Sequence, residues 1–510
     1  MSEAVLRVGA ILRADFLIRF RRVSTAVIFV LLSAIAYLWV PDPRTGRTLI
    51  QVDGSRAIYN SAAIGMATAM LGTMFIGLIG FYVVSNAIRR DVLSRCGFVA
   101  ASTTMRSGEY VFGKFLGNIA FLATFLGGFA AVSMAMVVVR GEGPLEPWTF
   151  IQQYLILSTP AVIFVSALAI LFESVPFLSG KFGDVVYFVV WVMSMSIVVS
   201  ITEKRGDALG LISFFDFSGF GFLWDYMHHV THTGALSIGS TSFDPKRPVY
   251  VFPGLKLSGA WALRRIAAGL MPLTLVGLAA LFFHRFDPVR VRKTVRHNGA
   301  NLLARINLRF KPLTRVMSRL IVVGQRPSFA RAVFADSIVS ISASPAILIA
   351  AIVVAFTGSL PIAFAAAGIA IADIASRDWR AGTTPLVYSS PRLQPLFVLW
   401  KFIATAAVVA FVLAIPIARA STSPWTAIVG ALFIAAAATG LGIVSNTPKT
   451  FTVLFLTFWY VVMNDKGMTR YLDFAGFFGK ANNAVMATYG VAALLLLAAA
   501  QVAHRRRLAA

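Results

Sequence analysis

Residues 88–115 read IRRDVLSRCGFVAASTTMRSGEYVFGKF, and residues 375–402 read ASRDWRAGTTPLVYSSPRLQPLFVLWKF. Both stretches contain Arg-Asp near their start, continue through small and hydroxyl residues, and end on Lys-Phe where a long apolar segment begins. The spacing from Asp91 to Lys114 equals the spacing from Asp378 to Lys401. A polar stretch that recurs between apolar segments predicts a duplicated membrane unit, in which this stretch is a loop.

The composition is that of a membrane protein, because 58% of the 510 residues are hydrophobic and only 13% are charged. A run of about 18 or more apolar residues predicts a transmembrane helix, since lipid offers the backbone no hydrogen-bond partner. Twelve such spans are predicted, at residues 24–40, 63–87, 115–139, 153–172, 185–201, 266–283, 338–356, 360–375, 402–418, 425–444, 451–463 and 484–502. The turn at 357–359 is so short that the seventh and eighth spans could instead be two legs of a re-entrant hairpin.

Two further sequence features repeat in the same order. Lys181 precedes Trp191 by the same spacing as Lys449 precedes Trp459, and an Asp-Phe-x-Gly element at 216–219 recurs at 473–476. The repeats predict an all-α integral membrane fold of about twelve transmembrane helices, arranged as two parallel six-helix units. The predicted domains are residues 1–285, a basic cytoplasmic connector at 286–336, and residues 337–510.

Residues 4–22 interleave five arginines with apolar residues, a pattern that predicts an amphipathic helix lying in the membrane interface. With the N-terminus in the cytoplasm, the inner segments carry roughly twice as many Lys and Arg residues as the outer ones, as expected for cytoplasmic loops. This orientation places both termini and both recurring loops in the cytoplasm. The net charge of +25 then faces anionic inner-leaflet lipid, and a nucleic-acid partner is not needed to explain it.

Two sequence motifs suggest a nucleotide or a metal site but lack residues that such sites need. Gly108 to Lys114 resembles a phosphate-binding loop, but Phe115 stands where that motif needs a magnesium-binding Ser or Thr. His228, His229 and His232 have no Cys nearby and are expected to belong to a polar helix rather than a metal site. We therefore expect no catalytic residue, no metal site and no nucleotide-binding domain in this chain.

The order of features resembles the ABC-2-type permease, the membrane subunit of type V-like ABC exporters. The resemblance rests on the basic N-terminal helix, six spans, the polar loop between spans 2 and 3, and the Asp-x-x-Gly element after span 5. It implies an exporter permease in the cytoplasmic membrane. Two copies of a separate ABC ATPase, which binds ATP and magnesium, would supply the energy. Family members usually have one six-span unit, whereas this chain fuses two, and further exporter subunits could join it.

The resemblance also implies roles for particular residues. ATPase docking by the coupling loops falls to Arg90, Asp91, Arg106, Lys114, Arg377, Asp378, Arg392 and Lys401. Secondary cytoplasmic contacts fall to Lys181 and Lys449, and outer re-entrant elements to Asp216, Phe217, Gly219, Asp473, Phe474 and Gly476.

Two other function classes remain as alternatives, an ion-coupled secondary transporter and a non-transporting membrane scaffold. No Asp, Glu, Lys or Arg is predicted near the middle of a span, which weighs against the ion-coupled carrier because buried ionisable residues mark ion pathways. The sequence leaves open the substrate, and whether one chain or a dimer forms the pore.

Overall fold

A computed structural model describes residues 3–21, 23–175, 178, 181–205, 214–257, 259–284, 286, 328–343, 345–357, 359–391, 393–420 and 423–509. The chain divides into two compact units, Met1–His297 and Asn298–Ala510, which are considered separately below. The division falls inside the predicted connector, of which residues 287–327 lie outside the described part of the chain. The first described helix of unit 2 begins at Phe329, eight residues before the predicted start of the second domain at residue 337.

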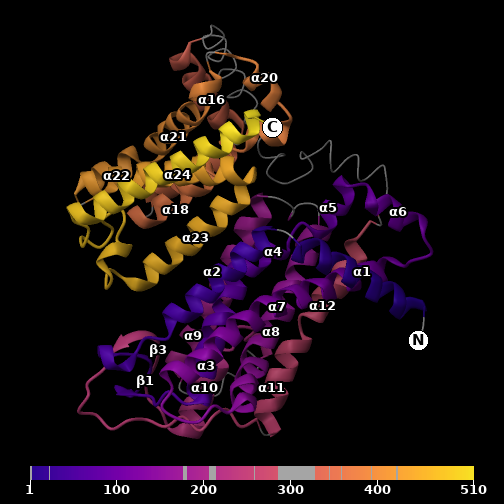
Figure 1. Ribbon diagram of the computed structural model, residues 1–510, viewed down its shortest axis with the longest axis vertical. Helices are drawn as coiled ribbons and strands as arrows, with labels where there is room; N and C mark the ends of the chain where they lie inside the picture. The colour runs from indigo at the N-terminus through magenta and orange to yellow at the C-terminus, as the bar shows by residue number, and fades with distance from the viewer. Residues whose placement is uncertain are drawn as a thin grey trace. The chain divides into compact units, whose positions relative to one another are not determined.

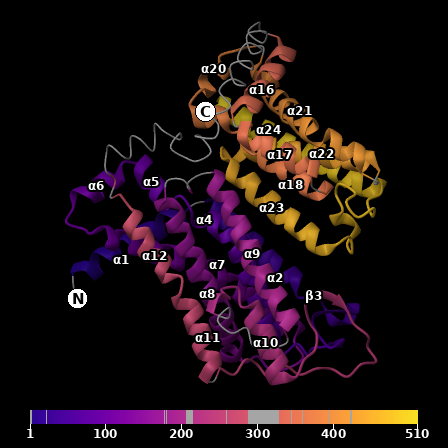
Figure 2. The same ribbon diagram turned by 180° about the vertical axis from the view of Figure 1, so that it is seen from behind.

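Unit 1 is a helical bundle with short helices at one end and a small sheet at the other (Figures 1 and 2). Its helices are α1 (Glu3–Phe20), α2 (Val23–Trp39), α3 (Ser61–Phe75), α4 (Phe81–Val84), α5 (Ala87–Leu93), α6 (Cys96–Ser102), α7 (Ser107–Arg140), α8 (Pro147–Ser174), α9 (Lys181–Arg205), α10 (Phe220–Thr231), α11 (Gly259–Leu270) and α12 (Leu273–Phe282). A π-helical turn, η2 (Ile76–Gly80), joins α3 to α4.

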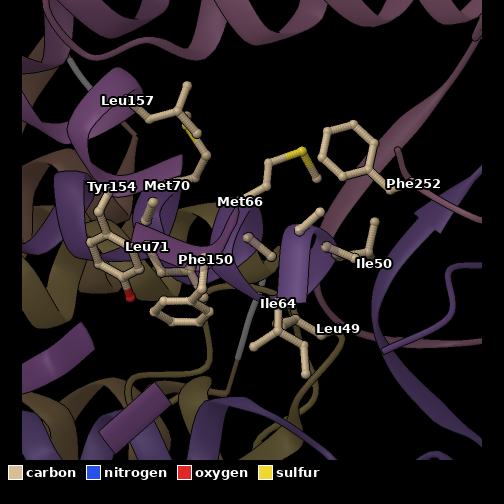
Figure 3. Close-up of a cluster of buried hydrophobic side chains, with 14 of the residues drawn as sticks. Leu49, Ile50, Ile64, Met66, Met70, Leu71, Phe150, Tyr154, Leu157 and Phe252 are labelled. Carbon is tan, nitrogen blue, oxygen red and sulfur yellow. The ribbon is translucent and has the colours of Figure 1, made fainter. Parts of the chain in front are cut away.

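Helix α3 lies at the centre of unit 1, packed between α7 and α8 and buried along nearly its whole length. Small residues make this packing possible, because they let helix backbones approach closely. A Cβ atom at Gly65 would lie 3.0 Å from the carbonyl oxygen of Phe150 in α8. Figure 3 shows the core around α3, with Ile64, Met66, Met70 and Leu71 of α3, Phe150, Tyr154 and Leu157 of α8, Leu49 and Ile50, and Phe252.

A three-stranded antiparallel sheet, which the predicted all-α fold did not include, covers the end of unit 1 opposite α5 and α6. Strand β1 (Arg47–Val52) lies between β2 (Ser55–Arg56) and β3 (Leu236–Ser242), and Ile50 faces Ile238 across the β1–β3 pair. Asp53 and Gly54 join β1 to β2 with φ angles of 48° and 80°, the conformation that Asp-Gly adopts in two-residue hairpins. The sheet thereby links the loop after α2 to the long loop after α10.

Unit 2 is also a helical bundle, in which α22 packs against α21, α23 and α24. Its helices are α16 (Phe329–Ala343), α17 (Pro345–Thr357), α18 (Leu360–Ile371), α19 (Arg377–Ala381), α20 (Thr384–Tyr388), α21 (Phe397–Arg419), α22 (Pro424–Ser445), α23 (Pro448–Asp465) and α24 (Asn483–Ala509), with short 3-10 turns η4 (Gln394–Leu396) and η5 (Arg470–Leu472). No sheet strand is present in the described residues of this unit.

Seven helices in the described residues are long and apolar enough to cross a membrane, at Ser61–Val92, Ser107–Arg140, Pro147–Ser174, Gly259–Phe282, Gln394–Arg419, Pro424–Ser445 and Asn483–Leu508. Ile28–Tyr37, Phe182–Ile197 and Leu360–Ile371 are shorter apolar helices. The chain is therefore a predominantly helical membrane protein.

The predicted seventh span, 338–356, falls on α16 and α17, and residue 344 between them lies outside the described residues. At 1.5 Å per residue, α17 and α18 are roughly 20 Å and 18 Å long, whereas the hydrocarbon core is about 30 Å thick. These two helices pack against each other.

Candidate functional site

The two recurring stretches occupy corresponding places in their units. In unit 1 the stretch follows α3 and α4 and leads into the long helix α7. In unit 2 it follows α18 and leads into the long helix α21. Each folds as a pair of short helices, α5 and α6 in unit 1 and α19 and α20 in unit 2 (Figure 1). We call these segments, residues 85–106 and 372–396, loop 1 and loop 2.

Loop 1 is held by a lysine that is buried between two carboxylates. The Nζ atom of Lys114, near the start of α7, lies 2.9 Å from Oδ1 of Asp15 and 2.7 Å from Oδ2 of Asp91. Asp15 belongs to α1 and Asp91 to α5, and the side chain of Lys114 is only 5% exposed. One ammonium group therefore ties together the N-terminal helix, the loop and the long helix that follows the loop.

Unit 2 repeats this arrangement. The Nζ atom of Lys401, near the start of α21, lies 2.8 Å from Oδ2 of Asp336 and 2.7 Å from Oδ2 of Asp378. Asp336 belongs to α16 and Asp378 to α19, and the side chain of Lys401 is 1% exposed. We call each set of three residues an Asp–Lys–Asp brace.

The brace of unit 1 carries additional cations. Arg19 lies 2.7 Å from Oδ2 of Asp15, and Arg90 of α5 also pairs with Asp15. Burial acts to raise the pKa of Asp15, but the charges of Arg19, Lys114 and Arg90 outweigh it and hold the pKa below its ordinary value. Asp15 is therefore ionised at neutral pH.

The surroundings of the two braces differ in charge. Tyr110 donates its hydroxyl proton to Oδ2 of Asp91 at 2.7 Å. In unit 2, Ser340 stands four residues after Asp336, as Arg19 stands four residues after Asp15. Arg377 donates to Oγ of Ser340 at 3.1 Å. Arg377 therefore contacts a hydroxyl group, whereas Arg90, its counterpart in unit 1, contacts the carboxylate of Asp15.

The braces change the interpretation of the charged residues that were expected to dock an ATPase. Lys114 and Lys401 are buried and paired within their own units, so they position the loops rather than present charge at a surface. The other predicted residues divide as follows: Arg90, Asp91, Arg377 and Asp378 are partly buried, Arg106 is exposed, and Arg392 lies outside the described residues.

Sequence reasoning missed the third member of each brace, Asp15 and Asp336. A signal was present, because both follow an alanine in the first described helix of their unit. The predicted second domain began at residue 337, which left Asp336 in the connector and hid the correspondence.

Both loops expose large apolar side chains among their polar residues. Val99 of α6 is 69% exposed beside Phe98, and Leu386 of α20 is 75% exposed, with Trp379 of α19 also exposed. Adjacent large apolar side chains on a surface mark an interaction site more often than isolated ones do. Each loop therefore offers an apolar contact surface, and the brace holds that surface in place.

The predicted secondary contact residues lie at the starts of α9 in unit 1 and α23 in unit 2. Lys181 is the first residue of α9, and Lys449 lies in the first turn of α23. The side chain of Thr447 caps α23 by accepting from the backbone nitrogen of Lys449 at 3.3 Å.

The two Asp-Phe-x-Gly elements lie at the ends of the units away from the loops. Oδ2 of Asp216 accepts from the backbone nitrogen of Phe222 at 2.7 Å, which caps the start of α10, and Oδ2 of Asp473 accepts from Lys480 nitrogen at 2.8 Å. Gly219 and Gly476 have φ angles of 79° and 73°, which favour glycine. Each carboxylate is buried and organises its own loop.

The phenylalanines of these elements differ between the units. The ring of Phe217 stacks on Phe164 of α8 with centroids 4.2 Å apart and is partly exposed. Phe474 is fully buried and contacts Phe364, Phe433, Phe458, Phe477 and Tyr489.

A buried arginine compensates for a proline inside α8. Pro160 has no N–H group, so it leaves the carbonyl oxygen of Ile156 without its normal helical donor. Nε of Arg265, on α11, donates to that oxygen at 3.0 Å, and the same guanidinium donates to Leu157 and Asp216 carbonyls. This charge serves backbone hydrogen bonding and ties α11 to α8 and to the Asp216 element.

Comparison of the chain with protein-family models, curated proteins and solved structures finds no match.

Proposed function

We propose that the chain is the permease of an ABC exporter, with two ABC-2-like units fused in one polypeptide and ATP hydrolysis supplied by a separate ATPase. The observation that carries the proposal is the duplicated Asp–Lys–Asp brace. A feature repeated at the same place in two units, on the loop that the family resemblance assigns to coupling, supports a shared mechanical role.

The brace supports that role physically. Loop 1 is tied through Lys114 to α7 and through Asp15 to α1, so displacement of the loop would be carried into both helices. Breaking such a buried ion pair costs about 3–5 kcal/mol, which is enough to make the three elements move together. Loop 2 has the same connection through Lys401 to α21 and α16.

In this proposal the partner contacts the exposed apolar residues of the loops. Val99 and Leu386, with Phe98 and Trp379, would insert into a groove of the ATPase, while exposed Arg106 would add charge. ATP and magnesium would bind only to the ATPase and would contact no residue of this chain. Both loops and both termini would face the cytoplasm, with the basic α1 on anionic inner-leaflet lipid.

The test is affinity purification of the full chain from its native host in mild detergent, followed by mass spectrometry. We expect an ABC ATPase in the purified complex, and we expect Val99→Glu combined with Leu386→Glu to release it, because a buried charge at an apolar contact is costly. The matched control is Val251→Glu, an exposed valine that follows Tyr250, whose β-bridge to Ala57 places it beside the small sheet of unit 1.

Failure to capture an ATPase with the unmodified chain would refute the exporter proposal. A chain that transports alone under an ion gradient would instead be a secondary carrier, and one that captures other proteins without transport would be a scaffold. Alanine at Arg90 and Asp91 is a weaker test, because Asp91 belongs to the brace and Arg90 pairs with Asp15 of the brace.

A further inference from the structure

A carboxylate on α8 holds the start of loop 1. Helix α5 begins at Ala87, and the first backbone N–H groups of a helix have no carbonyl partner within it. Oε1 of Glu173, near the end of α8, accepts from the nitrogen of Ala87 at 2.9 Å. Oε2 of the same side chain accepts from the nitrogens of Ile88 at 2.7 Å and Arg89 at 3.2 Å. One carboxylate therefore satisfies the first three donors of α5.

This contact is strong in relation to the helix that it holds. Helix α5 has only seven residues, and isolated helices shorter than about 12–15 residues are marginal in water. Hydrogen bonds to an ionised acceptor are roughly twice as strong as neutral ones, and a negative charge is favourable at a helix start. Ala87 and Ile88 are buried, so water has little access to the contact. Glu173 therefore stabilises both α5 and its position on α8.

Glu173 adds a third helix to the attachments of loop 1. The brace joins loop 1 to α1 through Asp15 and to α7 through Lys114. Asp91, the brace residue of the loop, belongs to the same short helix whose start Glu173 holds. Helix α5 is therefore connected by charged side chains to α1, α7 and α8.

Unit 2 has a glycine where α22 approaches loop 2. Ala375 matches Ile88 by the spacing of the two recurring stretches. A Cβ atom at Gly442 of α22 would lie 3.0 Å from Cβ of Ala375 and 3.8 Å from the nitrogen of Ser376. Within the described part of unit 2, no side chain caps the start of α19 at Arg377. Helix α22 therefore packs against loop 2 without supplying a carboxylate to it.

The other attachments of the loops have counterparts in both units. Each loop has a brace, and each is also reached from the end of the last helix of its unit. Phe286, which follows α12, packs so closely on Gly97 of α6 that a Cβ atom would lie 2.5 Å from its ring. His504 of α24 contacts the hydroxyl of Tyr388 at 3.2 Å and the carbonyl oxygen of Gln394 at 2.9 Å. Among the described residues, the carboxylate of Glu173 is thus the attachment that distinguishes loop 1.

We propose that Glu173 is a positioning residue that fixes loop 1 to α8, and that the two loops are therefore mechanically unequal. Displacement of loop 1 would move α8 together with α1 and α7, whereas displacement of loop 2 would reach α16 and α21 through its brace alone. The fixing of loop 1 needs no partner. Its consequence for two ATPase copies, which would act on a stiffer loop 1 and a looser loop 2, rests on the proposed function.

The test is amide hydrogen–deuterium exchange of the purified full chain in detergent, read by mass spectrometry on peptides covering residues 87–93 and 377–381. Glu173→Gln keeps the size of the side chain but removes its charge and one acceptor oxygen. We expect it to accelerate exchange at 87–93 about tenfold and to leave 377–381 unchanged. Glu173→Leu should accelerate exchange at 87–93 further. Glu146→Gln is the matched control, because Glu146 is exposed at the opposite end of α8 and accepts from the hydroxyl of Thr149.

Exchange at 87–93 that Glu173→Gln and Glu146→Gln affect equally would overturn the proposal, because the charge of Glu173 would then not position the loop. Equal acceleration at 87–93 and 377–381 would also overturn it, because that result reports general loosening. If Glu173→Leu does not fold, the Gln variant decides alone. Selective acceleration in a chain that captures no ATPase would retain the role of Glu173 and reject the exporter. A captured ATPase with unchanged exchange would reject the role of Glu173 alone.

Discussion

Replacing Lys401 by Met is the most direct test of the brace. The substitution keeps a side chain of similar length but removes the only ammonium group that the structure places between Asp336 and Asp378. Asp336 is then left largely buried without its cation, and its side chain is only 9% exposed. Loss of one partner of a buried ion pair costs about 3–5 kcal/mol, and the partial exposure of Asp378 favours the lower end.

Unit 2, Asn298–Ala510, has a size at which each kcal/mol lowers the melting temperature by about 2–4 °C. We therefore expect Lys401→Met to lower the melting temperature of the purified protein in detergent by roughly 6–12 °C, as measured by tryptophan fluorescence. Lys480→Met is the matched control, because Lys480 is exposed, and its effect should stay within about 0.5 kcal/mol.

A double-mutant cycle separates the ion pair from other effects of the substitution. In the Lys401→Met background, Asp336→Asn removes the stranded charge and should restore part of the lost stability, giving a coupling of about 1–3 kcal/mol. Additive losses, or a melting temperature of Lys401→Met equal to that of Lys480→Met, would refute the role of the brace.

Three other predictions follow from the geometry. The folded-state pKa of Asp15 is lowered. The ionised carboxylate of Asp15 therefore stabilises the fold above its unfolded pKa, and this stabilisation is lost as pH falls through and below about 4. The difference in melting temperature between the unmodified chain and Asp15→Asn should shrink in acid. Arg265→Leu should cost roughly 2–4 kcal/mol in thermal unfolding, because it leaves buried carbonyls without donors, whereas Lys256→Leu at an exposed position should stay within about 0.5 kcal/mol; equal losses would contradict this. Gly476→Ala should destabilise more than Gly382→Ala, because both have positive φ but only at Gly476 would Cβ collide, 2.3 Å from a threonine hydroxyl; equal melting temperatures would disprove the collision.

Local patterns predicted a large part of the fold. Apolar runs located the long helices, because a helix in lipid satisfies its own hydrogen bonds regardless of its neighbours. The repeated spacing of Asp91 with Lys114 and of Asp378 with Lys401 located two members of each brace.

The remaining features depend on partners that are distant in the chain. Asp15 meets Lys114, and strand β1 pairs with β3, across separations that no local period encodes. Whether a lysine is a docking charge or a buried brace depends on burial, and burial is decided by which helices pack together. The sequence alone therefore determined the helices and the repeated loops of this protein. Only the tertiary structure decided that Lys114 and Lys401 are internal and that Arg265 compensates for Pro160.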